Sequence, residues 1–258
     1  MTDFPTYLQS KALSEATVQA YTSSMIHYFS MFPEVTTENV YLYRQRCLEI
    51  HKPMTVNLRL NAIRKYAKYK GLDVEIPLVR IQEPIFAENV LTDKEYGKIL
   101  TFLANTGQTD WLVAIRLLSG TGLRITESYQ VTVGDLRNCT RKEIVGKGTK
   151  SRTVWFPLKM RQDVLPLLKG RQNAEKVMLW PDNYVRVKLK TLQKKLRIKA
   201  KVSPHELRRY FARKVYAKSR DIYLVKDLLG HRNIQTTMRY LRVTVQSVSK
   251  RMSRLVDW

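Results

Sequence analysis

The sequence of 258 residues has few acidic residues, few cysteines and no long apolar run. Only 22 aspartates and glutamates stand against 46 lysines and arginines, which gives a formal charge of +24. Cys47 and Cys139 lie far apart, so we expect neither a disulfide framework nor a zinc site and infer a reducing cytoplasm. No secretory signal pattern opens the sequence, and no apolar stretch approaches the roughly 18 residues that span a bilayer. The composition therefore argues against secreted disulfide-rich and membrane-spanning proteins.

The surplus of basic residues is the strongest compositional signal. Self-repulsion at this charge opposes a compact fold, so a partner of opposite sign is expected. Nucleic acid is the first candidate, because each phosphate that lysine or arginine neutralises releases condensed counterions. An anionic membrane surface and a surface tuned only for solubility are the alternatives. With 44% hydrophobic residues the chain can bury a core, so wholesale disorder is not expected.

Helix signals dominate the first 80 residues. A cap at Ser14, a second cap at Thr36 or Thr37, prolines and a glycine predict helices over about 14–32, 37–50 and 54–69, the last one ending at Gly71. On the third helix an apolar stripe runs beside an arc of basic and amide side chains. The stripe contains Val56, Leu60, Ile63 and Ala67, and the arc contains Asn57, Asn61, Arg64, Lys65 and Lys68. The arc suits a DNA groove or backbone, and a merely solvated face is the alternative.

A linker is predicted over residues 81–90, where Pro84 stands in a segment without a clear period. Thr92, followed three residues later by Glu95, forms a capping-box pattern that opens the next helix. The sequence therefore predicts a small helical domain followed by a second domain over residues 91–258.

The second domain is expected to be mostly helical around one β-hairpin. Its strands are predicted at 144–145 and 154–156, on either side of a Gly-Lys-Gly-Thr turn that contains Lys147. Upstream of this hairpin, Arg124 follows a Gly-Thr-Gly break at the start of a helix. Glu127 comes one turn later.

Further candidate residues lie downstream of the hairpin. His205 and Arg208 are spaced i, i+3 near a helix start, so they share one face. His231 follows Gly230, where a helix should end, and Tyr240 comes nine residues later. Each residue alone is usually explained as a surface charge, a cap or a packed ring. Their occurrence together in this order is hard to obtain by chance.

Four segments carry a resemblance to a known family. They resemble the signature blocks of the tyrosine recombinase (phage integrase) family, most of all its compact Xer-type members. The segments are GTGLRITESYQVTVGDL, IVGKGTKSRTVWFP, SPHELRRYFA and LLGHRNIQTTMRY. The order Arg…Lys…His-x-x-Arg…His…Tyr matches the family pattern. The resemblance covers nearly the whole chain, without the additional arm-binding domain of larger phage integrases.

The resemblance implies a phosphodiester reaction with Tyr240 as the nucleophile. A free phenol has a pKa of about 10 and is almost wholly protonated at neutral pH, so the reaction needs help from neighbouring groups. By resemblance, Arg124 and Arg208 bind the non-bridging phosphate oxygens. Arginine suits this role because it stays charged and makes forked contacts with phosphate. The product would be a 3′-phosphotyrosyl link that conserves the bond energy, so rejoining needs no ATP.

Proton transfer and orientation are implied for the remaining residues. Lys147 is expected to protonate the departing 5′-oxygen, and Lys150 in the same hairpin is the alternative acid. His205 resembles the general acid/base of the family, and His231 is expected to hydrogen-bond the scissile phosphate. Glu127 is expected to orient the neighbouring arginine or its helix.

No metal or other cofactor is expected, because arginines supply the charge that a divalent cation would and the sequence shows no carboxylate cluster of the two-metal kind. Further cations are expected to contact DNA. These are Arg59, Arg64, Lys65, Lys68, Lys150, Arg152 and Arg209.

The resemblance also implies the fold and the partners. The fold is mainly α with a small β-sheet, in which a helical core-site-binding domain over 1–80 and an α/β catalytic domain form a C-shaped clamp. The expected partners are a double-stranded DNA recombination site and further copies of the chain, as a dimer on one site and a tetramer in synapsis. An apolar stripe after Tyr240 is expected to act as an exchange helix on a neighbouring protomer, or else to fold onto its own domain. The DNA sequence, accessory proteins and biological role are not implied, beyond a cytoplasmic, nucleoid-associated location.

Two departures and two competing functions accompany the resemblance. Arg209 stands where the family often has histidine, and Leu241-Arg242 replaces a common Thr-His pair. A type IB topoisomerase would use the same nucleophile, but that group usually has lysine where this chain has His205. A non-catalytic DNA-binding relative would usually have lost at least one of the six candidate catalytic residues. Site-specific DNA recombination or integration is therefore the predicted function.

Overall fold

The structure is a computed structural model that describes residues 3–81, 89–146 and 151–241. The chain divides into two compact units, Met1–Glu83 and Pro84–Trp258. Most of the expected linker falls on residues 82–88, outside the described part of the chain, so the domain boundaries stay a prediction.

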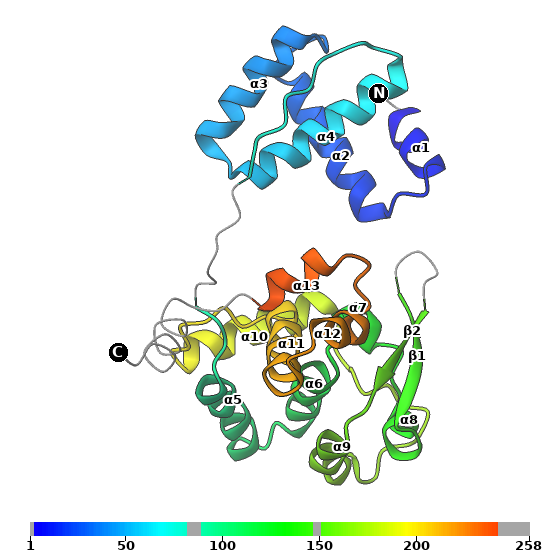
Figure 1. Ribbon diagram of the computed structural model, residues 1–258, viewed down its shortest axis with the longest axis vertical. Helices are drawn as coiled ribbons and strands as arrows, with labels where there is room; N and C mark the ends of the chain where they lie inside the picture. The colour runs from blue at the N-terminus through cyan, green and yellow to red at the C-terminus, as the bar shows by residue number, and fades with distance from the viewer. Residues whose placement is uncertain (1–2, 82–88, 147–150, 242–258) are drawn as a thin grey trace. The chain divides into compact units, whose positions relative to one another are not determined.

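The first unit is helical, as the blue-to-cyan ribbon in Figure 1 shows. Its helices are α1 (Asp3–Ser10), α2 (Glu15–Phe29), α3 (Thr37–Ile50) and α4 (Pro53–Lys70). The Ser14 and Thr36 hydroxyls cap α2 and α3 by accepting hydrogen bonds from the backbone N–H groups of Thr17 and Asn39. Helix α4 ends at Gly71, whose φ of 66° lies in the left-handed region. The predicted local signals therefore set the ends of these helices.

The core of the first unit explains a helix that the sequence prediction did not include. The stripe on α4 is buried: Val56, Leu60 and Ile63 are 0% exposed and Ala67 is 4% exposed. Phe4 of α1 belongs to the same cluster, and its ring lies edge-on to a tyrosine ring of α4. A helix of eight residues is too short to be stable alone, so α1 depends on this packing rather than on local signals.

The polar arc beside the stripe is partly used inside the unit. The Asn57 amide pairs with the backbone of Val79: Nδ2 donates to the carbonyl and the backbone N–H donates to Oδ1, both at 2.8 Å. Arg64 Nη2 donates to the carbonyl of Ile76 at 3.4 Å, whereas Lys68 is exposed. Part of the arc therefore holds the segment after α4 against that helix.

The second unit combines helices with a two-stranded sheet. Its elements are α5 (Asp93–Asn105), α6 (Thr109–Thr121), α7 (Ile125–Ser128), α8 (Val133–Asn138), β1 (Arg141–Val145), β2 (Ser151–Trp155), α9 (Leu158–Val164), a 3-10 helix η1 (Leu165–Leu168), α10 (Asp182–Lys195), α11 (Pro204–Ser219), α12 (Ile222–Leu229) and α13 (Ile234–Leu241). The mainly helical fold with a small sheet is as predicted. In the described part of the chain, no helix is long and apolar enough to cross a membrane.

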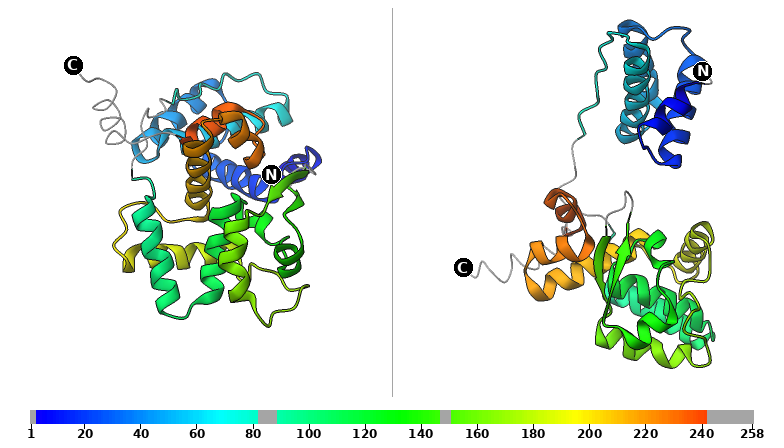
Figure 2. Two further views of the ribbon diagram at one scale, coloured as in Figure 1. Left: turned by 60° about the horizontal axis from the view of Figure 1, so that its bottom comes forward. Right: turned by 90° about the vertical axis from the view of Figure 1, so that its right-hand side faces the viewer.

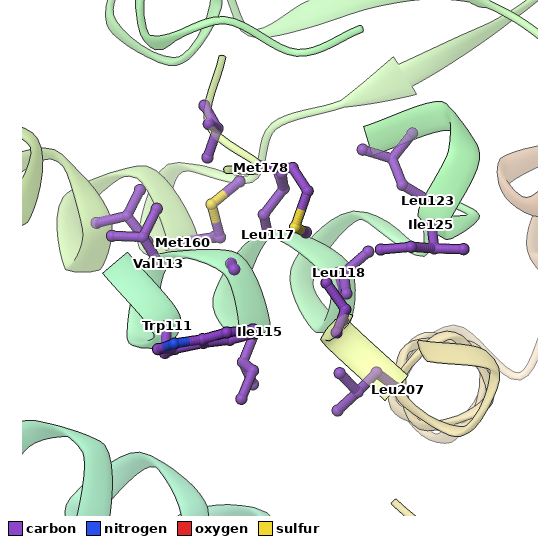
Figure 3. Packing of buried hydrophobic residues seen from close by; sticks show 14 of the residues in the cluster. Trp111, Val113, Ile115, Leu117, Leu118, Leu123, Ile125, Met160, Met178 and Leu207 are labelled. Atoms are coloured by element: carbon purple, nitrogen blue, oxygen red, sulfur yellow. The ribbon is translucent and has the colours of Figure 1, made fainter. Parts of the chain in front are cut away.

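Helix α6 lies at the centre of the second unit. Figure 3 shows its Leu117 and Leu118 among apolar side chains from several elements, including Met160 of α9 and Leu207 of α11. Helix α11 packs against α6, α12 and α13, and α12 also contacts strand β2 (Figure 1, Figure 2). Because α11 touches both the central helix and the last described helices, it fixes where residues from α13 lie relative to the core.

The β-hairpin is longer than predicted. Strands β1 and β2 pair antiparallel from Arg141 opposite Trp155 to Val145 opposite Ser151. The predicted strands covered only the apolar residues, so the polar start of each strand was missed. Of the expected Gly-Lys-Gly-Thr turn, residues 147–149 lie outside the described part of the chain.

Gly122 is expected to be intolerant of substitution, and Gly107 provides a matched control. Both have φ near 65°. A Cβ at Gly122 would lie 2.4 Å from Cδ1 of Phe211, whereas a Cβ at Gly107 would have no such neighbour within 4 Å. We expect Gly122→Ala to lower the free energy of unfolding by about 2–4 kcal/mol and Gly107→Ala by about 1 kcal/mol.

Denaturant titrations monitored by tryptophan fluorescence will measure this difference, because all four tryptophans belong to the second unit. Equal losses for the two variants would show that the overlap with the Phe211 ring is relieved at no cost.

Candidate active site

Residues that are far apart in the sequence meet where α7, α11, α12 and α13 come together. Arg124 directly precedes α7, His205 and Arg208 lie on the first turns of α11, His231 follows α12, and Tyr240 lies on α13. The rings of His205 and His231 both contact the ring of Tyr240, with centroids 5.0 and 4.9 Å apart. The structure thus brings together five of the six residues predicted to be catalytic.

Two left-handed glycines direct the chain into this site. Gly122 ends α6 and Gly230 ends α12, each with φ of 64°. Only glycine adopts this conformation at little cost, so each helix can stop abruptly. The chain turns after each glycine, and these turns bring Arg124 and His231, which are far apart in the sequence, into the same region.

Glu127 is a buried carboxylate that several guanidinium groups share. Its side chain is 3% exposed, and its Oε1 lies 2.6 Å from Nη1 of Arg124. Its Oε2 lies 2.9 Å from Nη2 of Arg152 and 3.7 Å from Nη1 of Arg208. Burial alone would raise the pKa of Glu127, but Arg152 and hydrogen bonds from Arg124 outweigh burial and lower it. The carboxylate is therefore ionised and offsets part of the positive charge.

Arg208 is the most enclosed of these cations, with a side chain 2% exposed. Its Nη1 donates to the carbonyl of Gly122 at 2.5 Å, and its Nη2 donates to the carbonyl of Leu229. Burial, followed by repulsion from Arg124 and Arg152, lowers its pKa to about 10. It remains protonated at neutral pH, and its position is fixed by the ends of two helices.

His231 is held as a neutral ring. Its Nε2 lies 3.3 Å from Nη2 of Arg208, and its Nδ1 lies 3.0 Å from Oγ1 of Thr237. A guanidinium can only donate, so Nε2 accepts and the ring proton is assigned to Nδ1, which donates to Thr237. Burial, and then repulsion from Arg208, Arg124 and Arg152, lowers the pKa of His231 to about 4.

Tyr240 is 9% exposed, and its hydroxyl lies 3.4 Å from Nδ1 of His205. The guanidinium of Arg209 lies 5.5 Å from the centroid of its ring. His205 keeps an exposed edge, yet partial burial, followed by repulsion from Arg209 and Arg208, lowers its pKa to about 4. A neutral imidazole therefore faces the tyrosine hydroxyl, which can donate a proton to it.

The remaining cations predicted near the site have different environments. Lys147 and Lys150 lie outside the described residues. Arg209 is 40% exposed and lies 3.6 Å from Oε2 of Glu206. Arg152, expected to contact DNA, is only 12% exposed and directs its guanidinium into the protein.

Of the predicted DNA contacts in the first unit, Arg59 is engaged by the protein itself. Its Nη1 lies 2.8 Å from Nδ1 of His27 and donates to the hydroxyl of Tyr43 at 3.3 Å. Lys65 is half-buried, and Lys68 is exposed. The sequence pattern located these cations on α4 but did not show which of them have partners within the unit.

The alternation of side chains along strand β2 indicates the inward direction of Arg152. Residues two apart on a strand share a face, and Val154 is an apolar strand residue that is 1% exposed. Arg152 therefore lies on the buried face of β2, opposite Ile144. The predicted strand begins only at Val154, so Arg152 lies outside it and is counted among the cations expected to contact DNA.

The described fold is mainly helical with a two-stranded sheet, and it brings together two arginines, two histidines and a tyrosine. The model of the phage integrase family matches residues 89–247. Tyrosine recombinase XerA of Thermococcus kodakarensis is 30% identical over 96% of this chain and 92% of its own length. The chain therefore belongs to the phage integrase family and is a tyrosine-type site-specific DNA recombinase.

Solved structures share the fold. A XerH recombinase bound to palindromic difH substrate, in a post-cleavage complex, has a TM-score of 0.72 at 19% identity and covers 92% of this chain and 79% of that chain. A lambda integrase dimer bound to a COC′ core site has a TM-score of 0.74 at 16% identity, covering 93% of this chain and 75% of that chain. The family and the fold class predicted from the sequence are thus confirmed.

Glu127→Gln is expected to destabilise the second unit, because three guanidiniums lose their shared negative charge. Removing one partner of a buried charge cluster costs about 3 kcal/mol in the free energy of unfolding. Glu175→Gln is a suitable control, since that side chain is 42% exposed and pairs with Arg171 at the surface. Urea titrations should show a large loss for Glu127→Gln and a much smaller one for Glu175→Gln. Similar losses would contradict the central role of Glu127.

The low pKa of His231 makes stability depend on pH. The unfolded chain takes up a proton at this histidine near its ordinary pKa of about 6.5, whereas the folded chain takes it up only near 4. More protons bind to the unfolded state between these values, so stability falls as the pH falls. From pH 7 to pH 5 we expect a loss of about 1–2 kcal/mol from this group. His231→Asn should show a correspondingly smaller loss in urea titrations at the two pH values, and identical losses would refute the assignment.

Proposed function

We propose that the protein cleaves and rejoins strands at a double-stranded DNA recombination site through a 3′-phosphotyrosyl link on Tyr240. The observation that carries this proposal is the position of the Tyr240 hydroxyl next to His205. Arg208 and His231 are hydrogen-bonded to each other, and the His231 ring contacts the ring of Tyr240. A nucleophile, a proton acceptor and fixed positive charge within one site are what transfer of a phosphodiester to a side chain requires.

The two arginines are proposed to bind the non-bridging oxygens of the scissile phosphate. Arg124 is 47% exposed, so its remaining N–H groups are open to a ligand while Glu127 orients it. Arg208 is held by two backbone carbonyls, so its guanidinium is already fixed in place when the phosphate arrives. Donors that are already in place cost little reorganisation as charge develops, and losing one typically lowers the rate by about 10²–10³-fold.

Proton movements are proposed to involve both histidines and the hairpin lysine. The Tyr240 oxygen forms a bond to phosphorus as its proton passes to His205, which is neutral and can accept it. The 5′-oxygen departs and takes a proton from Lys147, with Lys150 as the alternative donor. In the reverse step a 5′-hydroxyl attacks the phosphotyrosine and releases Tyr240, so the bond energy is conserved without ATP.

His231 is proposed to contact the same phosphate. Its Nε2 accepts from Arg208 in the free protein, so donation to a phosphate oxygen requires a proton on that nitrogen. An incoming phosphate favours the charged imidazole and raises its pKa. DNA binding and protonation of His231 should therefore favour each other.

The proposed partners are double-stranded DNA and further copies of the chain, as a dimer on one site and a tetramer in synapsis. The net charge of +24 supports a nucleic-acid partner, and similar folds occur in a XerH recombinase bound to difH substrate and a lambda integrase dimer bound to a core site. The helical unit is proposed to bind the core site. The proposed exchange helix falls on residues 242–258, outside the described part of the chain.

A covalent-trapping experiment tests the proposal. Nicked duplexes carrying inverted repeats from the DNA next to the gene are incubated with the protein, denatured and resolved for protein–DNA adducts. The wild-type protein should form an adduct, Tyr240→Phe should form none, and Tyr223→Phe should form it normally because that side chain is 65% exposed on α12.

An adduct that survives Tyr240→Phe would overturn the assignment of the nucleophile. Tyr240-dependent adducts on DNA without any repeat, together with relaxation of supercoiled plasmid, would instead indicate topoisomerase activity.

A further inference from the structure

Arg152 has the surroundings of an internal brace rather than of a DNA-contacting side chain. Its Nη1 donates to the carbonyl of Leu228 at 2.5 Å, and its Nη2 lies 2.9 Å from Oε2 of Glu127. The two ends of one planar group thus connect strand β2 to the last turn of α12 and to the buried carboxylate. Both terminal nitrogens of Arg152 therefore already have partners within the protein.

Gly230 provides a second, independent sign of this arrangement. A Cβ at Gly230 would lie 2.4 Å from Cδ of Arg152, so the arginine stem passes through the space that any side chain there would fill. Gly230 also has φ of 64°, and His231 follows it directly. The turn that presents His231 is therefore packed against the stem of Arg152, while the head of Arg152 holds the carbonyl two residues before Gly230.

We propose that Arg152 is a positioning residue of the recombinase site, which holds Glu127 and the Gly230–His231 turn in place without itself neutralising a DNA phosphate. The inference rests on the proposed function of the site and assigns Arg152 a role different from the DNA contact expected from the sequence. Arg152 thereby keeps the groups around the scissile phosphate in their positions relative to one another.

The physical basis is the sharing of one carboxylate. Arg152 Nη2 and the backbone N–H of Arg124 both donate to Oε2 of Glu127, at 2.9 and 2.8 Å. Without Arg152, the carboxylate is free to shift toward Arg208, which lies 3.7 Å away, and to draw that guanidinium from its present position. Lysine carries the same charge but is a point donor, so it cannot make both contacts in the plane that arginine spans.

Loss of Arg152 should also be sensed at His231. Arg152 is one of the cations whose repulsion lowers the pKa of that imidazole, and it supports the turn that precedes it. Its removal should raise the pKa of His231. A side chain with only a general folding role would not produce this change in a protein that remains folded.

The main experiment compares Arg152→Lys and Arg152→Ala with Arg141→Ala, which removes a charge from an exposed position on β1 of the same hairpin. Three quantities are measured on the full chain: the salt dependence of affinity for the nicked duplexes, the single-turnover rate of adduct formation at saturating DNA, and the His231 pKa by NMR titration.

We expect both Arg152 variants to keep the wild-type salt dependence and to form the adduct about 100-fold more slowly, as small misplacements of reacting groups do. The His231 pKa should rise in Arg152→Ala, which removes the charge. Arg141→Ala should form the adduct at the wild-type rate once DNA is saturating. Lysine should not rescue the rate, although it restores the charge.

Gly230→Ala displaces the stem of Arg152 without removing its charge and should slow adduct formation in the same way. Gly107→Ala, with a similar φ and open space around it, is its control. If Arg152→Ala does not fold, Arg152→Lys and Gly230→Ala decide the matter.

A salt slope reduced by about one, with a normal rate at saturating DNA, would show that Arg152 contacts a phosphate and would overturn the proposal. Full rescue by lysine, or an unchanged His231 pKa in folded Arg152→Ala, would overturn it as well. Failure of the proposed function would be seen differently, as the absence of a Tyr240-dependent adduct in the wild-type protein.

Discussion

The site depends on one buried carboxylate placed among cations that would otherwise repel one another. Glu127 lies within 3.7 Å of guanidinium nitrogens from Arg124, Arg152 and Arg208. In a poorly solvated interior, three such charges without a counter-charge would be costly to assemble. With one carboxylate among three arginines, a net charge of two remains, and it is held in place before any phosphate arrives. This is the condition under which fixed charge stabilises a transition state without reorganisation.

The neutral state of both histidines follows from the same surplus of positive charge. Both His205 and His231 stand among arginines, and burial together with this repulsion lowers the pKa of each to about 4. Two neutral rings can therefore lie against Tyr240 in the free protein, one accepting from Arg208 and one facing the hydroxyl. An anionic ligand would reverse part of the repulsion and make protonation easier. The protonation state of the site is thus coupled to occupancy by phosphate.

Local signals made much of the fold predictable. Ser14 and Thr36 cap helices where the sequence places them, and Gly71 ends α4 because its left-handed conformation is a backbone property. The order of the candidate catalytic residues was also readable, and the structure brings those that it describes together. Helix α1 was missed because its stability comes from the contact of Phe4 with distant residues. Tertiary contacts of this kind leave no local pattern.

Whether an arginine side chain points into the protein or toward a partner was the least predictable feature, for a physical reason. A guanidinium carries five donors, so it can satisfy carbonyl groups of its own protein as readily as phosphate oxygens. Arg161 donates to the carbonyls of Leu136 and Arg137 at 2.7 Å, as Arg152 does to that of Leu228. A count of basic residues therefore indicates an anionic partner but overstates the number of contacts with it. The strand alternation that places Arg152 beside buried Val154 is the kind of evidence that separates the two uses, because it gives the direction of the side chain as well as its charge.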